Sequence, residues 1–154
     1  MALYFYNGII GKYCLQETNG TLTRMWVGNR LSLVPENDNI QETDLLREAK
    51  AQLDAYFDHR LKEFSLPLTP QGTDFQLSIW KLLQQIPYGK TLTYGEIAAL
   101  SGNPHASRAV GMANGKNPLP VFIPCHRVIG SSGKLTGYTG GLDIKQTLLK
   151  LESL

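Results

Sequence analysis

The residues of this chain best suited to covalent chemistry are Cys125 and His126, which stand side by side behind Pro124. A cysteine attacks as its thiolate, and an unperturbed thiol is only weakly ionised at neutral pH. A nearby imidazole can take the thiol proton and stabilise the anion. Neighbouring side chains of extended chain point to opposite sides, so we expect the proton to pass through one water rather than directly.

The same pair also fits a simpler interpretation, because cysteine is among the most buried residue types. A core cysteine next to an unrelated histidine would have the same sequence. The chain has two cysteines and three histidines. The other cysteine, Cys14, lies in an expected strand, where burial is its expected role.

Length and composition limit the class of protein. The 154 residues, 42% of them hydrophobic, suffice for one domain or two small ones with a packed core. Two cysteines are too few for a disulfide scaffold, which indicates a reducing compartment. We expect no signal peptide, and no stretch approaches the roughly 20 apolar residues of a membrane helix. The expected location is the cytoplasm, or the nucleus if the source is eukaryotic.

Charge is divided unevenly along the chain. Residues 1–70 hold seven Lys/Arg and nine Asp/Glu, a net charge of −2, whereas residues 71–154 hold eight and four, a net charge of +4. The Cys-His pair lies in the basic half, which suits a polyanionic partner. We expect an N-terminal α+β domain over 1–70 and a C-terminal domain over 71–154.

The N-terminal part has the pattern of an antiparallel sheet followed by one helix. Asn19-Gly20 is a strong hairpin signal, and Thr43 or Asp44 can cap a helix with one apolar stripe. Residues 64–68 suggest an edge segment, because the proline within them cannot donate to a ladder. The expected strands span residues 3–6, 11–16 and 22–27.

The C-terminal part is mainly helical by the same criteria. Thr73 or Asp74 can cap its first helix, and Thr93 with Glu96 forms a capping-box pattern before its second. A tight turn over residues 101–104 joins the second helix to the third, which is a helix-turn-helix pattern. The expected helices span residues 74–86, 94–100, 105–114 and 142–151.

The third of these helices consists mostly of small residues and carries one long cation, Arg108. Such a smooth surface could press close to a nucleic-acid backbone, with the arginine projecting from it. Close helix–helix packing with a solvated Arg108 explains the pattern equally well. The glycine-rich loop over residues 136–141 offers backbone amides that could approach a planar ligand.

A longer set of motifs surrounds the Cys-His pair, with GKNPLP at 115–120, PCHRV at 124–128 and GYTGGL at 137–142. From about Phe75 to Glu152 the chain resembles the O6-alkylguanine-DNA alkyltransferase family, the methylated-DNA–protein-cysteine methyltransferases. The resemblance implies an α+β fold with a small N-terminal antiparallel sheet and helix, ribonuclease-H-like. A mainly helical C-terminal domain with a helix-turn-helix would follow.

The resemblance also implies direct DNA repair. Cys125 would attack the alkyl carbon on O6 of guanine and keep the group as a thioether, so each molecule acts once. His126 would deprotonate Cys125 through a water, and Glu152 would hold the His126 ring. The implied partner is double-stranded DNA containing O6-alkylguanine, bound by a monomer without a cofactor.

Further roles follow from the resemblance alone. Asn117 matches a hinge asparagine that ties the helix-turn-helix to the active-site loop, and Tyr94 and Lys145 match donors to the leaving guanine. Arg108 matches the residue that fills the gap left by a flipped base. The base pocket would be lined by Val128, Tyr138, Thr139 and Gly140, and the minor-groove surface by Tyr94, Ala106, Ser107, Ala109 and Ser131.

Two departures and three alternatives accompany this interpretation. Asp74 stands where the family often has proline, and this acid could weaken phosphate contact. Some members hold a structural zinc, but Cys14, His59 and His105 are too few and too scattered for a four-ligand site, so we expect no metal. The alternatives are a lesion binder without transfer, a DNA-binding regulator and a thiol hydrolase.

Overall fold

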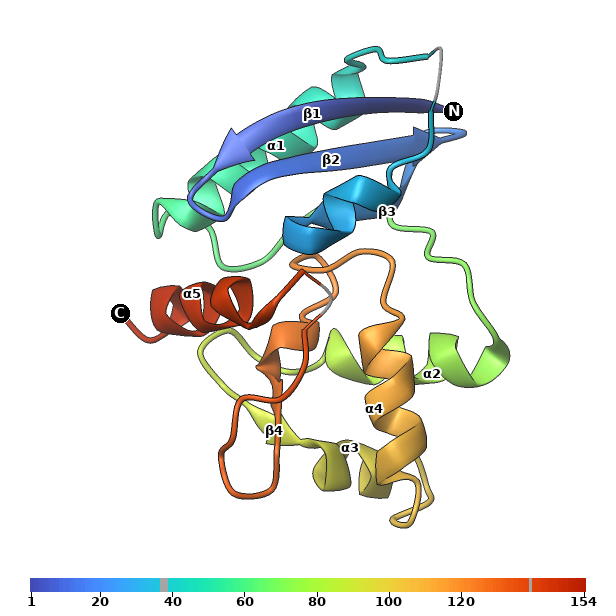
Figure 1. Ribbon diagram of the computed structural model, residues 1–154, viewed down its shortest axis with the longest axis vertical. Helices are drawn as coiled ribbons and strands as arrows, with labels where there is room; N and C mark the ends of the chain where they lie inside the picture. Colours follow the sequence, from blue (N-terminus) through green and yellow to red (C-terminus); the bar gives the residue numbers. More distant parts are fainter. Residues whose placement is uncertain (37–38, 139) are drawn as a thin grey trace.

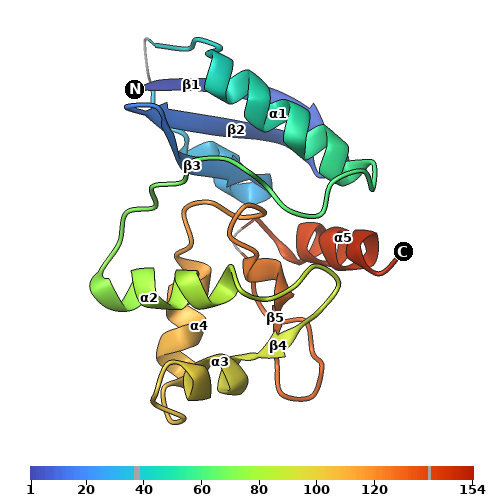
Figure 2. The same cartoon turned by 180° about the vertical axis from the view of Figure 1, so that it is seen from behind.

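The computed structural model describes residues 1–36, 39–138 and 140–154. Figure 1 shows two layers, a three-stranded sheet backed by one helix and, below it, a group of shorter helices. The C-terminal helix α5 (Leu142–Glu152) lies between the two layers, as the view from behind also shows (Figure 2). No described helix is long and apolar enough to cross a membrane.

The sheet consists of three antiparallel strands paired in chain order: β1 (Ala2–Gly8), β2 (Gly11–Thr18) and β3 (Thr21–Val27). All three predicted strands are confirmed, each slightly longer than its pattern suggested. Asn19 and Gly20 turn the β2–β3 hairpin with positive φ angles of 53° and 80°. A two-residue turn of type I′ requires this combination, and asparagine and glycine adopt it at least cost.

The two faces of the sheet pack against different elements. One face packs against α1 (Asp44–Phe57), which buries Leu53 and Tyr56. The other face carries a smaller cluster of Leu3, Cys14 and Trp26, packed against Leu31 of the 3₁₀ helix η1 (Gly28–Leu33). Cys14 is fully buried there, as its strand position suggested.

Specific hydrogen bonds fix the start of α1 and the segment that follows this helix. Thr43 caps α1 by accepting from Leu46 N, which decides between the two candidate caps. Further on, Leu22 N donates to Pro67 O and Thr69 N donates to Leu22 O, both at 2.9 Å. The segment with Pro67 therefore runs beside β3 as a short parallel bridge, which agrees with the expected edge segment.

Helices α2 and α3 begin where their caps predict, and α2 ends early. Thr73 and Thr93 form capping boxes with Gln76 and Glu96. The first helix was expected to reach residue 86 but stops three residues sooner, because the bonds Gln85 N→Leu82 O and Ile86 N→Leu83 O tighten its end ahead of a proline. The three helices are α2 (Asp74–Leu83), α3 (Tyr94–Leu100) and α4 (Ser107–Gly115).

Helices α3 and α4 pack against each other across a turn of residues 101–106. Helix α4 was expected from residue 105 and starts two residues later, because His105 N is held by Asn103 Oδ1 at 3.0 Å within the turn. Two short strands, β4 (Leu92–Thr93) and β5 (Val128–Ile129), pair in parallel. This pairing was not predicted, and it ties the start of α3 to the segment that follows the Cys-His pair.

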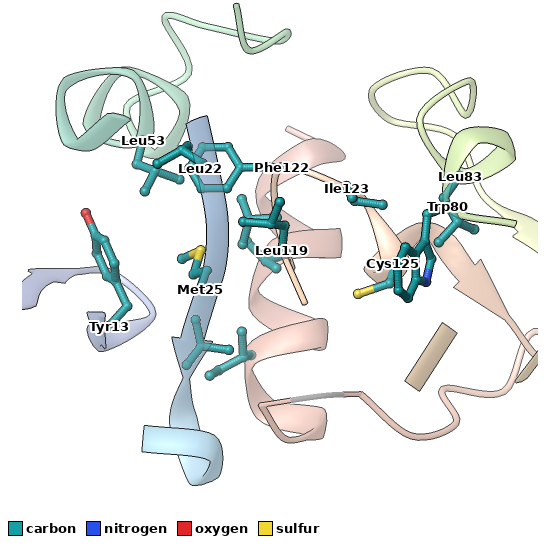
Figure 3. Packing of buried hydrophobic residues seen from close by; sticks show 14 of the residues in the cluster. Tyr13, Leu22, Met25, Leu53, Trp80, Leu83, Leu119, Phe122, Ile123 and Cys125 are labelled. Carbon is teal, nitrogen blue, oxygen red and sulfur yellow. The ribbon is translucent and has the colours of Figure 1, made fainter. Parts of the chain in front are cut away.

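The hydrophobic core continues across the boundary expected at residue 70. Met25 of β3, Leu119 and Cys125 belong to one hydrophobic cluster, and Figure 3 shows Cys125 on the side of the cluster away from β3. Met25 N also donates to Pro118 O at 2.8 Å. The sheet therefore supports the segment that leads into the Cys-His pair.

Candidate active site

Cys125 and His126 lie in a short 3₁₀ turn, η2 (Cys125–Arg127), so the expectation of extended chain at this point was wrong. Arg127 N donates to Pro124 O at 3.0 Å and closes the turn. Pro124 itself has a ψ of 65°, well short of the extended range. Neighbouring side chains of such a turn diverge by about 120°. The thiol and the imidazole thus leave the backbone in different but not opposite directions.

Cys125 sits in packed surroundings. Its residue is 1% exposed and belongs to the main core cluster. Figure 3 shows it near Trp80 and Leu83 of α2. Its carbonyl accepts from Asn114 Nδ2 at 3.4 Å, which connects it to the last turn of α4. A group added to this sulfur must therefore be accommodated by its neighbours.

Glu152, at the end of α5, collects donors from three parts of the chain: Tyr56 of α1, the backbone of Gly89, and the η2 turn. Its Oε2 lies 2.7 Å from His126 Nε2, and Arg127 binds both carboxylate oxygens, through Nε at 2.8 Å and Nη2 at 2.9 Å. Tyr56 of α1 donates to Oε2 at 2.5 Å. Burial alone would raise the pKa of Glu152, but the hydrogen bonds from His126, Arg127 and Tyr56 outweigh it and hold that pKa well below its usual range.

His126 is completely buried, and burial lowers the pKa of its imidazole. Glu152 opposes this shift, while the cations Arg127 and Lys145 add to it. An ionised carboxylate can only accept hydrogen bonds, so Nε2 carries the proton of the neutral ring. His126 Nδ1, which has no hydrogen-bond partner among the described residues, then presents a buried lone pair. The ring is thus built as a proton acceptor at Nδ1.

Asn117 clamps the segment before the reactive pair. Its Nδ2 donates to Ile123 O at 2.8 Å, and its Oδ1 accepts from Leu119 N at 3.0 Å. Between these contacts Val121 is held at a φ of 74°, although a β-branched residue avoids the left-handed region. Such a conformation costs on the order of 1–3 kcal/mol and persists only where the surroundings fix it. The hydrogen bonds of Asn117 are part of these surroundings, and one of them ends at Ile123, two residues before Cys125.

Lys145 is fully buried on α5. Its Nζ donates to Val128 O at 2.6 Å and to Thr136 O at 2.9 Å. Burial lowers the pKa of this amine, and the nearby thiol of Cys125 opposes the shift. Two of its three N–H donors are thus engaged with carbonyls on either side of the loop over residues 130–135. Structurally, Lys145 joins this loop to α5.

A pocket of about 810 Å³ opens between α3, α4 and the glycine-rich loop. Tyr94, Ser107, Arg108, Ser131 and Tyr138, all expected from the sequence, are among its lining residues. Arg108 is exposed, and the Tyr94 hydroxyl accepts from Thr136 Oγ1 at 2.9 Å. The pocket therefore gathers residues from four separate parts of the chain, since Arg30 of η1 also lines it.

Tyr138 connects this pocket to the reactive pair. It lines the pocket, yet its hydroxyl is buried without a partner among the described residues. Burial raises the pKa of Tyr138 well above its usual value, and the closeness of Cys125 raises it further. Tyr138 therefore both lines the pocket and lies close enough to Cys125 to feel its charge.

Four of the remaining expected residues, Ala106, Ala109, Val128 and Gly140, do not line the pocket. Ala106 and Ala109 belong to the start of α4, Ala106 half-buried and Ala109 exposed. Val128 contributes the carbonyl bound by Lys145, and the carbonyl of buried Gly140 accepts from Asn29 N at 3.2 Å. Thr139 lies outside the described residues.

Sequence reasoning missed several residues of the site. Asn114 and Arg127 had a local signal. Asn114 directly precedes the GKNPLP motif, and Arg127 lies within PCHRV, but Arg127 was not recognised as the partner of Glu152. Tyr56 and Arg30, which lines the pocket from η1, come from the N-terminal half. Nothing in the local sequence around these two indicates a site, because only the tertiary fold brings them there.

Among residues 1–36, 39–138 and 140–154, no group of three His, Cys, Asp or Glu side chains is arranged to hold a metal ion. The described site presents the following side chains. It combines a buried thiol, a neutral imidazole held by a carboxylate, and two cations.

Comparison with known proteins places this arrangement in a family. Residues 74–154 match the model of the 6-O-methylguanine DNA methyltransferase DNA-binding domain. A methylated-DNA–protein-cysteine methyltransferase of Methanosarcina acetivorans is 59% identical over 113 residues, covering 73% of this chain and 72% of the relative. This chain belongs to the methylated-DNA–protein-cysteine methyltransferase family.

Two members of this family are similar over nearly the whole chain. The constitutive methyltransferase of Bacillus subtilis is 44% identical over 152 residues, with 94% of this chain and 91% of the relative covered. The structure of Mycobacterium tuberculosis OGT in complex with DNA aligns with a TM-score of 0.91 at 43% identity, over 99% of this chain and 93% of that one. The sheet-bearing N-terminal half is therefore part of the likeness.

Proposed function

We propose that the protein repairs DNA by transferring an alkyl group, typically methyl, from O6 of guanine to Cys125 in a single turnover. The observation that carries this proposal is the buried set of Cys125, His126 and Glu152, close to Tyr138 of a pocket that Arg108 also lines. Membership of the methyltransferase family supports the same chemistry.

The chemical step is an in-line displacement at the alkyl carbon. The thiol proton passes to His126 Nδ1, through one water, and the sulfur lone pair forms the new S–C bond. The C–O6 bond breaks, and its electron pair goes to the guanine. The proton taken from the thiol restores the guanine N–H through the solvent, so the products are a thioether and guanine. The molecule has no step that regenerates the thiol.

Glu152 serves this step by orienting His126 and by stabilising the imidazolium that forms. Tyr94, whose hydroxyl lies at the pocket, donates to the leaving guanine. The contacts of Lys145 suggest a different role from the donor expected by resemblance. We propose that its ammonium group stabilises the thiolate and holds the Val128 carbonyl at the base pocket, together with Tyr138, Thr139 and Gly140.

DNA binding is assigned to the α3–turn–α4 unit, acting as a helix-turn-helix whose second helix enters the minor groove. The small residues of α4 allow a close approach to the groove, and Arg108 fills the gap left when the damaged base turns into the pocket. The net charge of +4 over residues 71–154 suits phosphate contacts without sequence preference. The groove contacts are assigned to Tyr94, Ala106, Ser107, Arg108, Ala109 and Ser131.

The proposal includes the setting in which the protein works. The partner is double-stranded DNA containing O6-alkylguanine, and the solved structure of the Mycobacterium tuberculosis relative contains DNA. The protein acts as a monomer, without cofactor or metal, in the cytoplasm, or in the nucleus of a eukaryote. The hinge role of Asn117 and the domain division at residue 70 belong to the same proposal.

The test is intact-protein mass spectrometry after mixing with a duplex that contains one O6-methylguanine. The expected result is a gain of one methyl group per protein molecule, with no further repair when more substrate is added. Binding without a mass change would indicate a lesion binder, and continued turnover on esters or peptides would indicate a thiol hydrolase. Either result would contradict the proposal.

A further inference from the structure

The carboxylate of Glu152 makes five hydrogen-bond contacts. On Oε2 these come from Tyr56, His126 and Arg127, and on Oε1 from Arg127 and from Gly89 N at 3.4 Å. A carboxylate offers about four lone-pair positions. The group is therefore saturated, and it cannot rotate without losing contacts.

Tyr56 is the one donor in this set that comes from the N-terminal half. It is 96 residues away from Glu152 in sequence and 1% exposed. Its ring packs edge-on against Phe57 at 5.7 Å and Tyr88 at 6.1 Å, and tilted against Phe64 at 5.3 Å. These ring contacts fix the direction of the hydroxyl. Because an ionised carboxylate only accepts, Tyr56 is the donor of the 2.5 Å bond.

We propose that Tyr56 is a positioning residue of the alkyl-transfer site. Its hydroxyl, together with the Arg127 guanidinium, fixes Glu152 so that Oε2 takes the Nε2 proton of His126, and the lone pair that accepts the thiol proton is confined to Nδ1. The inference rests on the proposed function, since it assigns Tyr56 to the relay that activates Cys125. The N-terminal sheet domain then contributes directly to the reactivity of the thiol.

The hydroxyl also sets how strongly His126 holds a proton. Tyr56 and His126 share the same oxygen, so donation from Tyr56 draws negative charge away from the bond to the imidazole. Removing this donor makes Oε2 more basic, which raises the proton affinity of His126. The ionisable groups around the pair are the cations Arg127 and Lys145, the thiol of Cys125, and the phenols of Tyr88 and Tyr138. None of these groups is changed by substituting Tyr56.

The test compares Tyr56→Phe with Tyr13→Phe. Tyr13 is a fully buried tyrosine of the neighbouring sheet, and its hydroxyl has no hydrogen-bond partner among the described residues. Both substitutions keep the ring and remove one buried hydroxyl, but only Tyr56→Phe removes a donor from Glu152. Circular dichroism and thermal unfolding establish that both variants are folded.

The first readout is the methyl-transfer rate against pH. His126 must be neutral to accept the proton, so the rate falls on the acid side as the imidazole protonates. We expect Tyr56→Phe to move this acid limb upward by about half a pH unit, which is roughly a threefold loss of rate on that side. Tyr13→Phe should keep the wild-type profile. If the acid side of the rate profile stayed in place in Tyr56→Phe, or if it shifted equally in both variants, the proposal would be overturned.

The second readout is nitrogen-15 NMR of the His126 ring, which reports its tautomer and titration without any DNA. The expected result is an Nε2–H tautomer in the wild type, with a higher titration midpoint in Tyr56→Phe than in Tyr13→Phe. Equal midpoints, or an Nδ1–H tautomer in the wild type, would contradict the role of Tyr56. If the wild type transferred no methyl group, the proposed function would fail, and this titration would still decide the role of Tyr56.

Discussion

Asn117 and Ile123 are joined by a hydrogen bond of 2.8 Å, from the Asn117 amide to the Ile123 carbonyl, inside the core. The same side chain accepts from Leu119 N, so one residue holds both ends of the strained turn at Val121. Cys125 lies two residues after Ile123. The position of the nucleophile therefore depends on a clamp that does not itself touch the sulfur.

Replacing this clamp should cost both stability and reactivity. In Asn117→Ala, the buried Leu119 N loses its acceptor, and an unsatisfied buried group costs about 1–3 kcal/mol. Ile123 O loses one of two donors and keeps its bond from Cys125 N at 2.7 Å. We expect a free energy of unfolding lower by about 1–3 kcal/mol in urea titration, and slower methyl transfer. Asn7→Ala, at an exposed asparagine of β1, is the matched control and should change neither quantity. Normal transfer by a destabilised Asn117→Ala protein would separate the clamp from the chemistry.

Arg108→Ala should impair repair of duplex DNA much more than reaction with free O6-benzylguanine. The free base needs no flipping, so it bypasses the task assigned to this arginine. The comparison uses second-order rate constants for the two substrates. Arg24→Ala removes the same charge from the sheet, where the guanidinium lies 5.2 Å from the Trp26 ring, and should leave the ratio of the two constants unchanged. Equal losses on both substrates in Arg108→Ala would mean that Arg108 supports the fold or the pocket.

Stability should fall as the pH drops below about 6.5, the ordinary pKa of histidine. The pKa of His126 is lower in the folded protein than in the unfolded chain. At a pH between these two pKa values, the unfolded chain binds a proton at His126 that the folded protein does not bind, so acidification favours unfolding. The Glu152 carboxylate, whose pKa is also lowered, adds a second loss below its ordinary pKa of about 4.3. Urea unfolding at a series of pH values measures both losses. His126→Gln should remove the upper one, and an unchanged slope in that variant would assign the loss to other groups.

Much of the fold could be predicted because its signals are local. The Asn19-Gly20 turn and the threonine caps of α1, α2 and α3 act through neighbours two or three residues away. The parallel pairing of β4 with β5 could not be predicted, since it joins two-residue strands 36 positions apart in register, Leu92 with Val128. Short strands of this kind carry no pattern of their own.

In the candidate site, too, local features could be predicted from the sequence and long-range contacts could not. Cys125 and His126 were visible as neighbours, but the extended geometry expected for them was wrong because η2 closes a turn after Pro124. The contact of His126 with Glu152 spans 26 residues and was expected only through the family resemblance. Tyr56 gave no signal at all. Residues of an active site that act through tertiary contacts are invisible to spacing rules.

Alkylation of Cys125 should destabilise the protein. The sulfur lies in the packed core, and an added methylene-sized group typically costs about 1–3 kcal/mol in such surroundings. We expect a lower melting temperature and faster proteolysis after stoichiometric reaction, with a larger effect for benzyl than for methyl. The unreacted protein carried through the same incubation with undamaged duplex is the control. An equal or higher melting temperature after reaction would show that the pocket accepts the group without strain.

The identity of the alkylated residue tests the central claim most directly. After reaction with a duplex containing O6-methylguanine, peptide mass spectrometry locates the methyl group among the two cysteines, Cys14 and Cys125. We expect one methyl group on Cys125 in the wild type and in Cys14→Ala, and none in a Cys125→Ala variant that still binds the duplex. A methyl group on Cys14, or stoichiometric transfer by Cys125→Ala, would contradict the account.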